Sequence, residues 1–193
     1  MTVFSDPLAA NLAVLGIIFF GIGSYAIYKY FMNKNEGSFD QGFSYFLIGT
    51  GLYSLVYGLF YSLLWPEPEG GAYSILFGDP LVMLGIVELF TAYILLKNSN
   101  LYFTGLFGFF AGIYAIVSGY DGFLDGMTKS PTAMLLLYLG AGFTGILVFP
   151  LVLTKNRYLG LLTGVIAFLT AIMALIIGIP ALGEHLIGFA HAP

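Results

Sequence analysis

The chemistry available to this chain centres on one acidic residue in an apolar stretch. Glu88 lies eight residues after Pro80, about 12 Å along a helix that begins at that proline. An acid at such a depth in a bilayer is costly and usually serves a function. Its helical neighbours Gly85 and Ala92 are small, so we expect this face to meet other helices rather than lipid.

Several hydroxyl side chains at matching depth could hydrogen-bond this acid. None of them is a cation, and desolvation without an opposing charge favours the protonated acid. Glu88 is then a proton-exchange or ion-coupling site, a neutral hydrogen-bond anchor between helices, or, third, a catalytic group. The sequence predicts an intramembrane polar site of Glu88, Tyr53, Tyr57 and Tyr114, with Thr144 and Thr170 as further candidate partners.

A second candidate site lies in the connections on one side of the predicted bundle. Asp121 and Asp125 fall in one such connection, and Glu184, His185 and His191 follow the last apolar stretch. Carboxylate oxygens suit calcium, and a mixed carboxylate and imidazole set suits zinc or copper. The spacing matches no defined motif, so Asp121, Asp125 and His185 are candidate metal ligands beside the alternative of a solvated acidic surface.

Six long apolar stretches must position these residues. A span of about 20 apolar residues crosses a bilayer core of about 30 Å. With 59% hydrophobic and 8% charged residues, nearly all of the 193 residues are used by such spans. We therefore predict one all-α domain over residues 1–193, with transmembrane helices at Leu8–Met32, Gly42–Trp65, Leu81–Leu96, Leu101–Tyr120, Thr132–Thr154 and Tyr158–Gly183.

The basic residues predict the orientation of the bundle. Five of them fall in or near the connections after the first, third and fifth helices: Lys29, Lys34, Lys97, Lys155 and Arg157. Only Lys129 lies on the other side, where most of the acids are found. Because short cytoplasmic loops are enriched in lysine and arginine, both termini are expected outside, in a multi-pass protein of the cell membrane.

Composition argues against several classes of function. The chain has no cysteine, which removes disulfides, iron–sulfur ligation and thiolate catalysis, and its two histidines lie at or beyond the end of the last helix. No Walker loop or dinucleotide fingerprint is present, and the first apolar stretch lacks the basic start of a cleavable signal peptide. We expect no enzyme, no cofactor and no nucleic-acid partner; the expected partner is the lipid bilayer.

The helix ends repeat along the chain. Asp6-Pro7, Asp79-Pro80 and Ser130-Pro131 each place a capping side chain before a proline, and Lys-Asn pairs end the same helices. This pattern predicts three helical hairpins of one orientation in one bundle. Either a degenerate threefold duplication or shared capping and loop chemistry would produce it. Small residues four apart predict close packing: Gly108 and Gly112, Ala141 and Gly145, Gly160 and Gly164.

The longest connection carries the most distinctive sequence. Residues 65–80 read Trp-Pro, a tyrosine-containing turn, then Phe-Gly-Asp-Pro at the entry to the next helix. In this segment the chain resembles a family of uncharacterised prokaryotic membrane proteins, domain of unknown function 981. Ser74 stands where that pattern favours asparagine. The resemblance implies the fold and a membrane location for the whole chain and supplies no activity.

Two functions are compatible with these features. The first is a channel or transporter for a small solute or ion, with Glu88 in its polar centre. The alternative is a non-catalytic subunit, as a homo-oligomer or beside other membrane proteins, with the glycine seams as its interface. A transporter needs Glu88, Tyr53 and Tyr114 to line a wet cavity, whereas a packing subunit would seal them.

Overall fold

The computed structural model describes residues 8–34, 36–64 and 70–190, with only the backbone for residues 8, 70 and 184–190. Six helical segments are long and apolar enough to cross a bilayer, and no strand occurs among the described residues. The predicted all-α, six-span fold is confirmed. In chain order the elements are α1 (Leu8–Ala26), η1 (Ile27–Phe31), α2 (Gly37–Leu64), α3 (Gly70–Tyr73), η2 (Ser74–Gly78), α4 (Asp79–Leu96), α5 (Tyr102–Leu124), α6 (Pro131–Thr154) and α7 (Arg157–Ala190), of which η1 and η2 are π-helical turns.

The third span begins at Gly71 rather than at Leu81, because α3, η2 and α4 follow one another without a break. Asp79 has right-handed helical backbone angles, φ −63° and ψ −44°, and lies inside this continuous helix. The prediction that Asp79 caps the helix start is therefore wrong.

A proline inside the third span explains why the sequence predicted too late a start for this span. Pro80 has no N–H, so the carbonyl of Leu76, four residues earlier, lacks the usual α-helical donor. The chain passes this point through the wider turn η2, and the hydroxyl of Tyr138 on α6 donates a hydrogen bond to Leu76 O. A contact from another helix thus allows the proline within the span.

Other helix ends agree better with the sequence. Ser130 occupies the N-cap position before Pro131, although its side chain makes no capping hydrogen bond. Asp6-Pro7 lies outside the described residues. Where the odd-numbered spans end, Asn33, Asn98 and Lys155 adopt left-handed backbone angles with φ of 53°, 49° and 51°, which turn the chain sharply.

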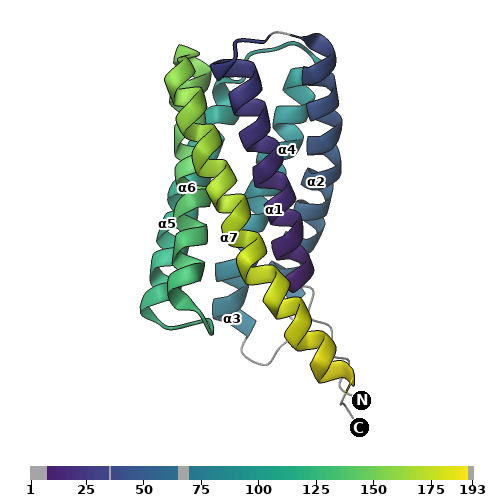
Figure 1. Cartoon of the computed structure of the whole chain (residues 1–193), viewed down its shortest axis with the longest axis vertical. Helices are drawn as coiled ribbons and strands as arrows, with labels where there is room; N and C mark the ends of the chain where they lie inside the picture. Colours follow the sequence, from purple (N-terminus) through teal and green to yellow (C-terminus); the bar gives the residue numbers. More distant parts are fainter. Residues whose placement is uncertain (1–7, 35, 65–69, 191–193) are drawn as a thin grey trace.

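The six spans form a closed ring in which each helix packs against its two neighbours in the chain, and α7 returns to α1 (Figure 1). The closest pairs are α5 with α6, α2 with α4, and α1 with α7. The helices do form three pairs in one bundle. The sequence, however, predicted that spans one and two, three and four, and five and six would pair. In the structure the closest pairs are spans two and three, four and five, and six and one.

Glycines bring each of these three pairs close together. A Cβ on Gly145 of α6 would lie 2.7 Å from Gly108 O of α5. A Cβ on Gly85 of α4 would lie 2.6 Å from Leu55 N of α2, and one on Gly164 of α7 would lie 3.1 Å from Gly23 O of α1. The predicted small-residue seams are therefore contacts within the ring.

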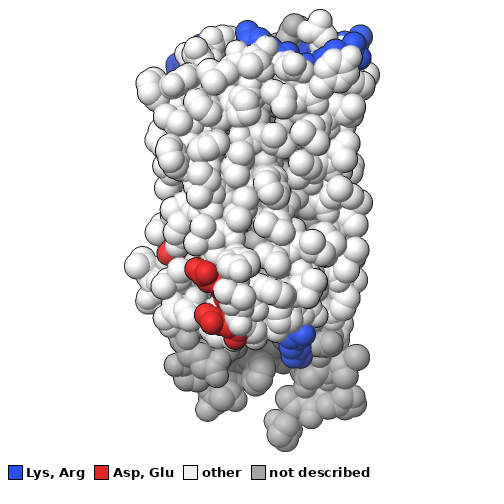
Figure 2. Space-filling view, turned by 90° about the vertical axis from the view of Figure 1, so that its left-hand side faces the viewer, with Lys and Arg blue, Asp and Glu red and all other residues white. Residues whose placement is uncertain are grey.

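The two ends of the bundle carry different charged side chains. Figure 2 shows lysine and arginine gathered at one end, above a broad band that is nearly free of charge. We call this the basic end; it carries Lys34, Lys97, Lys155 and Arg157. The opposite, acidic end carries Asp121, Asp125 and Lys129. The uncharged band is the part of the surface that suits the hydrocarbon core of a bilayer.

Candidate functional site

Glu88 lies between α4 and α2, where only 2% of its surface is exposed. Gly51 on α2 faces it so closely that an added Cβ would lie 3.0 Å from Glu88 Cβ. The hydroxyl of Thr50 donates a hydrogen bond to Glu88 Oε1 at 2.7 Å. The acid therefore joins two packed helices through a hydroxyl that the sequence did not single out.

The second carboxyl oxygen of Glu88 has no hydrogen-bond partner among the described residues, and neither does the buried hydroxyl of Ser54 on α2. Ser54 lies one helical turn beyond Thr50, on the same side of α2. A protonated Glu88 could donate to such an acceptor, whereas a bare carboxylate would leave a buried charge without a cation. This arrangement is compatible with a hydrogen-bond anchor between α2 and α4, one of the roles that the sequence left open.

The three predicted tyrosine partners make other contacts. Tyr53 and Tyr57 pack against each other along α2, with ring centroids 4.4 Å apart and ring planes tilted by 34°. Tyr114 on α5 donates to Asp79 Oδ2 at 3.0 Å. Among the described residues, no hydrogen bond joins Glu88 to Tyr53, Tyr57 or Tyr114. The threonines offered as further partners donate to their own helices, Thr144 to Gly140 O and Thr170 to Ile166 O.

Asp79 is the centre of a second polar cluster. Its Oδ1 accepts a hydrogen bond from Ser62 on α2 at 2.7 Å, and its Oδ2 accepts one from Tyr114 on α5. One carboxylate on α4 thus connects three consecutive spans. The sequence drew attention to Asp79 for a different reason, and nothing in the spacing of Ser62 or Tyr114 pointed to it.

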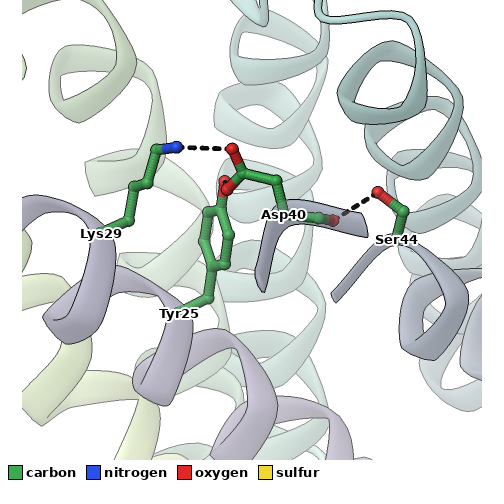
Figure 3. Close-up of polar contacts among 4 residues, drawn as sticks. All are labelled: Tyr25, Lys29, Asp40 and Ser44. Atoms are coloured by element: carbon green, nitrogen blue, oxygen red, sulfur yellow. Dashed lines mark hydrogen bonds and ion pairs between the residues drawn. The ribbon is translucent and has the colours of Figure 1, made fainter. Parts of the chain in front are cut away.

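A third polar cluster lies toward the basic end, between α1 and α2. Lys29 Nζ is 2.5 Å from Asp40 Oδ2, and the hydroxyl of Tyr25 donates to Asp40 Oδ1 at 2.9 Å. Figure 3 shows Tyr25 and Lys29 pointing from one helix toward Asp40 on the next. The ring of Tyr25 stacks on Phe43 with centroids 4.1 Å apart. This cluster joins α1 and α2, which otherwise pack sparsely.

The centre of the ring holds a cavity of about 490 Å³. All six spans contribute to its lining, which is largely apolar and includes Leu84, Val87, Leu137 and Ile177. Glu88 is not among the lining residues, since it faces α2 rather than the ring centre. Tyr53, Tyr57 and Tyr114 do not line the cavity either.

Polar groups enter this cavity mainly near the acidic end. Thr128, Lys129 and Ser130 line it from the connection between α5 and α6. Asn11 of α1, also in the lining, donates to the hydroxyl of Tyr61 on α2 at 2.8 Å. Sequence reasoning missed Asn11, although an amide three residues into an apolar span was a usable signal.

Of the predicted metal ligands, only Asp121 and Asp125 have described side chains. Asp121 is an exposed residue in the last turn of α5, and the exposed Asp125 caps the end of that helix. His185, Glu184 and His191 lie outside the residues whose side chains are described. Among the side chains that the structure describes, no group of three or more acidic or histidine residues could hold a metal ion.

Comparison with known proteins identifies a family and no activity. A family model described as "Protein of unknown function (DUF981)" matches residues 1–188. No curated protein and no solved structure matches the chain.

Proposed function

The chain belongs to the DUF981 family of proteins of unknown function, and we propose that it is a transporter-like membrane protein that takes a largely apolar small molecule into the cavity of its helical ring. The cavity carries this proposal. Its volume of about 490 Å³ lies within the usual range of small-molecule sites, about 300–1,000 Å³. Its polar lining lies toward the acidic end, so the molecule enters from that end.

Orientation completes the proposal. Because the basic end carries four cations in its short connections, it faces the cytoplasm, and the acidic end faces outside. The start of α1 and the end of α7 lie at the acidic end, which gives an N-out and C-out protein of the cell membrane. The molecule is then taken from the outer side.

Glu88 has a supporting role in this proposal. A proton-coupled transporter would use the acid where substrate or water can reach it, but Glu88 is sealed between α2 and α4. We therefore assign it as an anchor between these two helices. None of the described residues that line the cavity carries a carboxylate, and the function we propose is binding and movement of a molecule, without catalysis.

The alternative of a packing subunit has lost its main support. Its expected interface was the set of glycine seams, yet Gly108, Gly145 and Gly164 face neighbouring helices within the ring. Association into homo-oligomers or with other membrane proteins would therefore use other surfaces. The sealed position of Glu88 fits either function.

A neutral apolar dye such as N-phenyl-1-naphthylamine, which brightens in apolar sites, tests the cavity. With protein in lipid nanodiscs, we expect a saturable rise in emission above that of empty nanodiscs. Ala111→Phe and Ala141→Phe, which place a large ring in the lining, should reduce this rise. Leu136→Phe, at an exposed position on α6, is the matched control and should leave it unchanged.

Transport requires a second measurement. Vesicles containing the protein should take up the dye faster than protein-free vesicles, and Ala141→Phe should abolish the difference. Saturable binding without faster uptake would contradict transport and leave only binding in the cavity. Emission identical in the wild type and both cavity variants would remove the proposed function altogether.

A further inference from the structure

Two connections that lie far apart in the sequence meet at one corner of the basic end. α1 packs against α7, and Cζ of Arg157, the first residue of α7, lies 5.0 Å from the ring centroid of Phe31 at the end of η1. Lys34 follows Phe31 closely in the chain, and Lys155 shortly precedes Arg157. The fold therefore gathers Lys34, Lys155 and Arg157 at one place, which we call the α1–α7 corner.

The cations of this corner have no acidic partner. The connections at the basic end are described except for the uncharged Asn35, and in them Lys34, Lys155 and Arg157 are exposed and form no ion pair. Asp40, an acid of the same region, is already paired with Lys29. The positive charge of the α1–α7 corner is therefore available to a ligand.

Aromatic rings hold the arginine of this corner in position. Cζ of Arg157 lies 5.6 Å from the ring centroid of Tyr158, in addition to its contact with Phe31. Such ring contacts fix a guanidinium while its N–H groups can still donate to other acceptors. The planar fork of these donors matches two oxygens of a phosphate group. Arg157 is thus prepared for a phosphate rather than for a single acceptor atom.

The α1–α7 corner lies at the rim of the uncharged band, where the cations of the basic end begin (Figure 2). Tyr158 is 70% exposed beside Arg157, and tyrosine rings favour the headgroup level of a bilayer. Farther from this end, α1 and α7 expose large apolar side chains: Ile17, Phe20, Leu162, Val165 and Leu169. A ligand with a phosphate group and alkyl chains would meet complementary groups at both levels.

From these features we infer that the α1–α7 corner binds the phosphate group of an acidic membrane phospholipid. Arg157 binds the phosphate, Lys34 and Lys155 supply further positive charge, and the acyl chains lie on α1 and α7. A zwitterionic headgroup carries its own cation and gains less from three positive side chains. None of the three cations lines the cavity, so the inference is independent of the proposed function.

Phosphatidylglycerol and phosphatidylcholine with the same acyl chains are the probes, and native mass spectrometry of the purified protein counts each bound lipid. From an equal mixture we expect the wild type to retain phosphatidylglycerol preferentially. Arg157→Gln and Lys34→Gln should each weaken phosphatidylglycerol binding about fivefold. Arg157→Lys should weaken it less than Arg157→Gln, because it keeps the charge and loses the fork of donors.

Lys97→Gln is the matched control. Lys97 is exposed at the same end, but it follows α4, which packs mainly against α2 and α5. This variant should bind phosphatidylglycerol as the wild type does. Equal losses in Lys97→Gln and Arg157→Gln would overturn the α1–α7 corner as a site and leave a diffuse attraction of the whole basic end. Equal retention of the two lipids by the wild type would overturn the preference for an acidic phospholipid.

A soluble competitor distinguishes a lipid from a free phosphate compound. Glycerol 3-phosphate carries the phosphate without acyl chains, and an excess of it should not displace phosphatidylglycerol. Displacement would overturn the lipid assignment. Because the substituted side chains are exposed, the variants should melt at the wild-type temperature. If either Arg157→Gln or Lys34→Gln is unstable, the other one suffices for the comparison with Lys97→Gln.

Discussion

The hydroxyl of Tyr114 on α5 and the carboxylate of Asp79 on α4 are joined by a hydrogen bond of 3.0 Å. Ser62 on α2 reaches the other oxygen of the same carboxylate. Asp79 is thereby a junction of three helices, and its replacement should affect the bundle more than the loss of a helix cap would.

We expect Asp79→Ala to lower the free energy of unfolding by about 2–3 kcal/mol, because two hydrogen bonds to a charged acceptor are removed. A lost cap alone would account for about 1 kcal/mol. Thermal unfolding in detergent measures the change, with Tyr114→Phe and the double variant completing a cycle. Additive effects of Asp79→Ala and Tyr114→Phe, or an Asp79→Ala protein as stable as Asp121→Ala, would contradict this role.

Replacement of Glu88 tests the anchor between α2 and α4. Glu88→Gln keeps the acceptor for Thr50 and adds an amide donor near Ser54, so its stability should stay within about 0.5 kcal/mol of the wild type. Glu88→Leu removes the hydrogen bond and leaves the Thr50 hydroxyl without this acceptor, and it should lower stability by about 1–2 kcal/mol. Thermal unfolding provides both values.

The same variants separate an anchor from a proton-coupling site. Uptake by vesicles with Glu88→Gln should match the wild type at every pH, since the acid does not line the cavity. A pH-dependent uptake in the wild type that disappears in a stable Glu88→Gln protein would show instead that the acid exchanges protons.

Glycine contacts allow a matched pair of substitutions. Gly145→Ala would bring a Cβ within 2.7 Å of Gly108 O, so backbone must shift between α5 and α6, and we expect a loss of about 1–3 kcal/mol. Gly49→Ala on α2 meets nothing within 4 Å and should leave stability unchanged or raise it by up to about 1 kcal/mol. Equal melting temperatures for the two variants would show that the α5–α6 contact is looser than described.

Single cysteines test the orientation, because the chain has none of its own. Asp125→Cys at the acidic end should react with a membrane-impermeant thiol reagent added to intact cells. Ser99→Cys at the basic end should react only after the membrane is permeabilised. The reverse labelling pattern would invert the protein and place the cavity entrance in the cytoplasm.

Much of the fold could be predicted because hydropathy fixes the number of spans. The end of the fifth span at Thr154 agrees with the structure, since it coincides with a change from apolar to polar residues. The start of the third span could not be predicted, because the tolerance for Pro80 depends on Tyr138, 58 residues further along the chain.

The candidate site was predictable in part. Composition and depth identified Glu88 as a buried polar residue, but the partner Thr50 depends on how α2 is rotated against α4. Sequence patterns carry little information on such rotation in helices that are apolar on every side. For the same reason, the cavity became visible only once six helices were arranged in a ring.

Closure of the ring by α1 and α7 has a consequence for biosynthesis. Gly16 and Gly23 of α1 lie against Leu175, Phe168 and Gly164 of α7, so α1 needs as its partner a helix that is made after the other five spans. As spans enter the bilayer in order, that glycine face of α1 stays exposed to lipid until residues beyond Arg157 have been translated. Every neighbouring pair that does not include α7 is already complete by then, and the ring closes when α7 packs between α6 and α1.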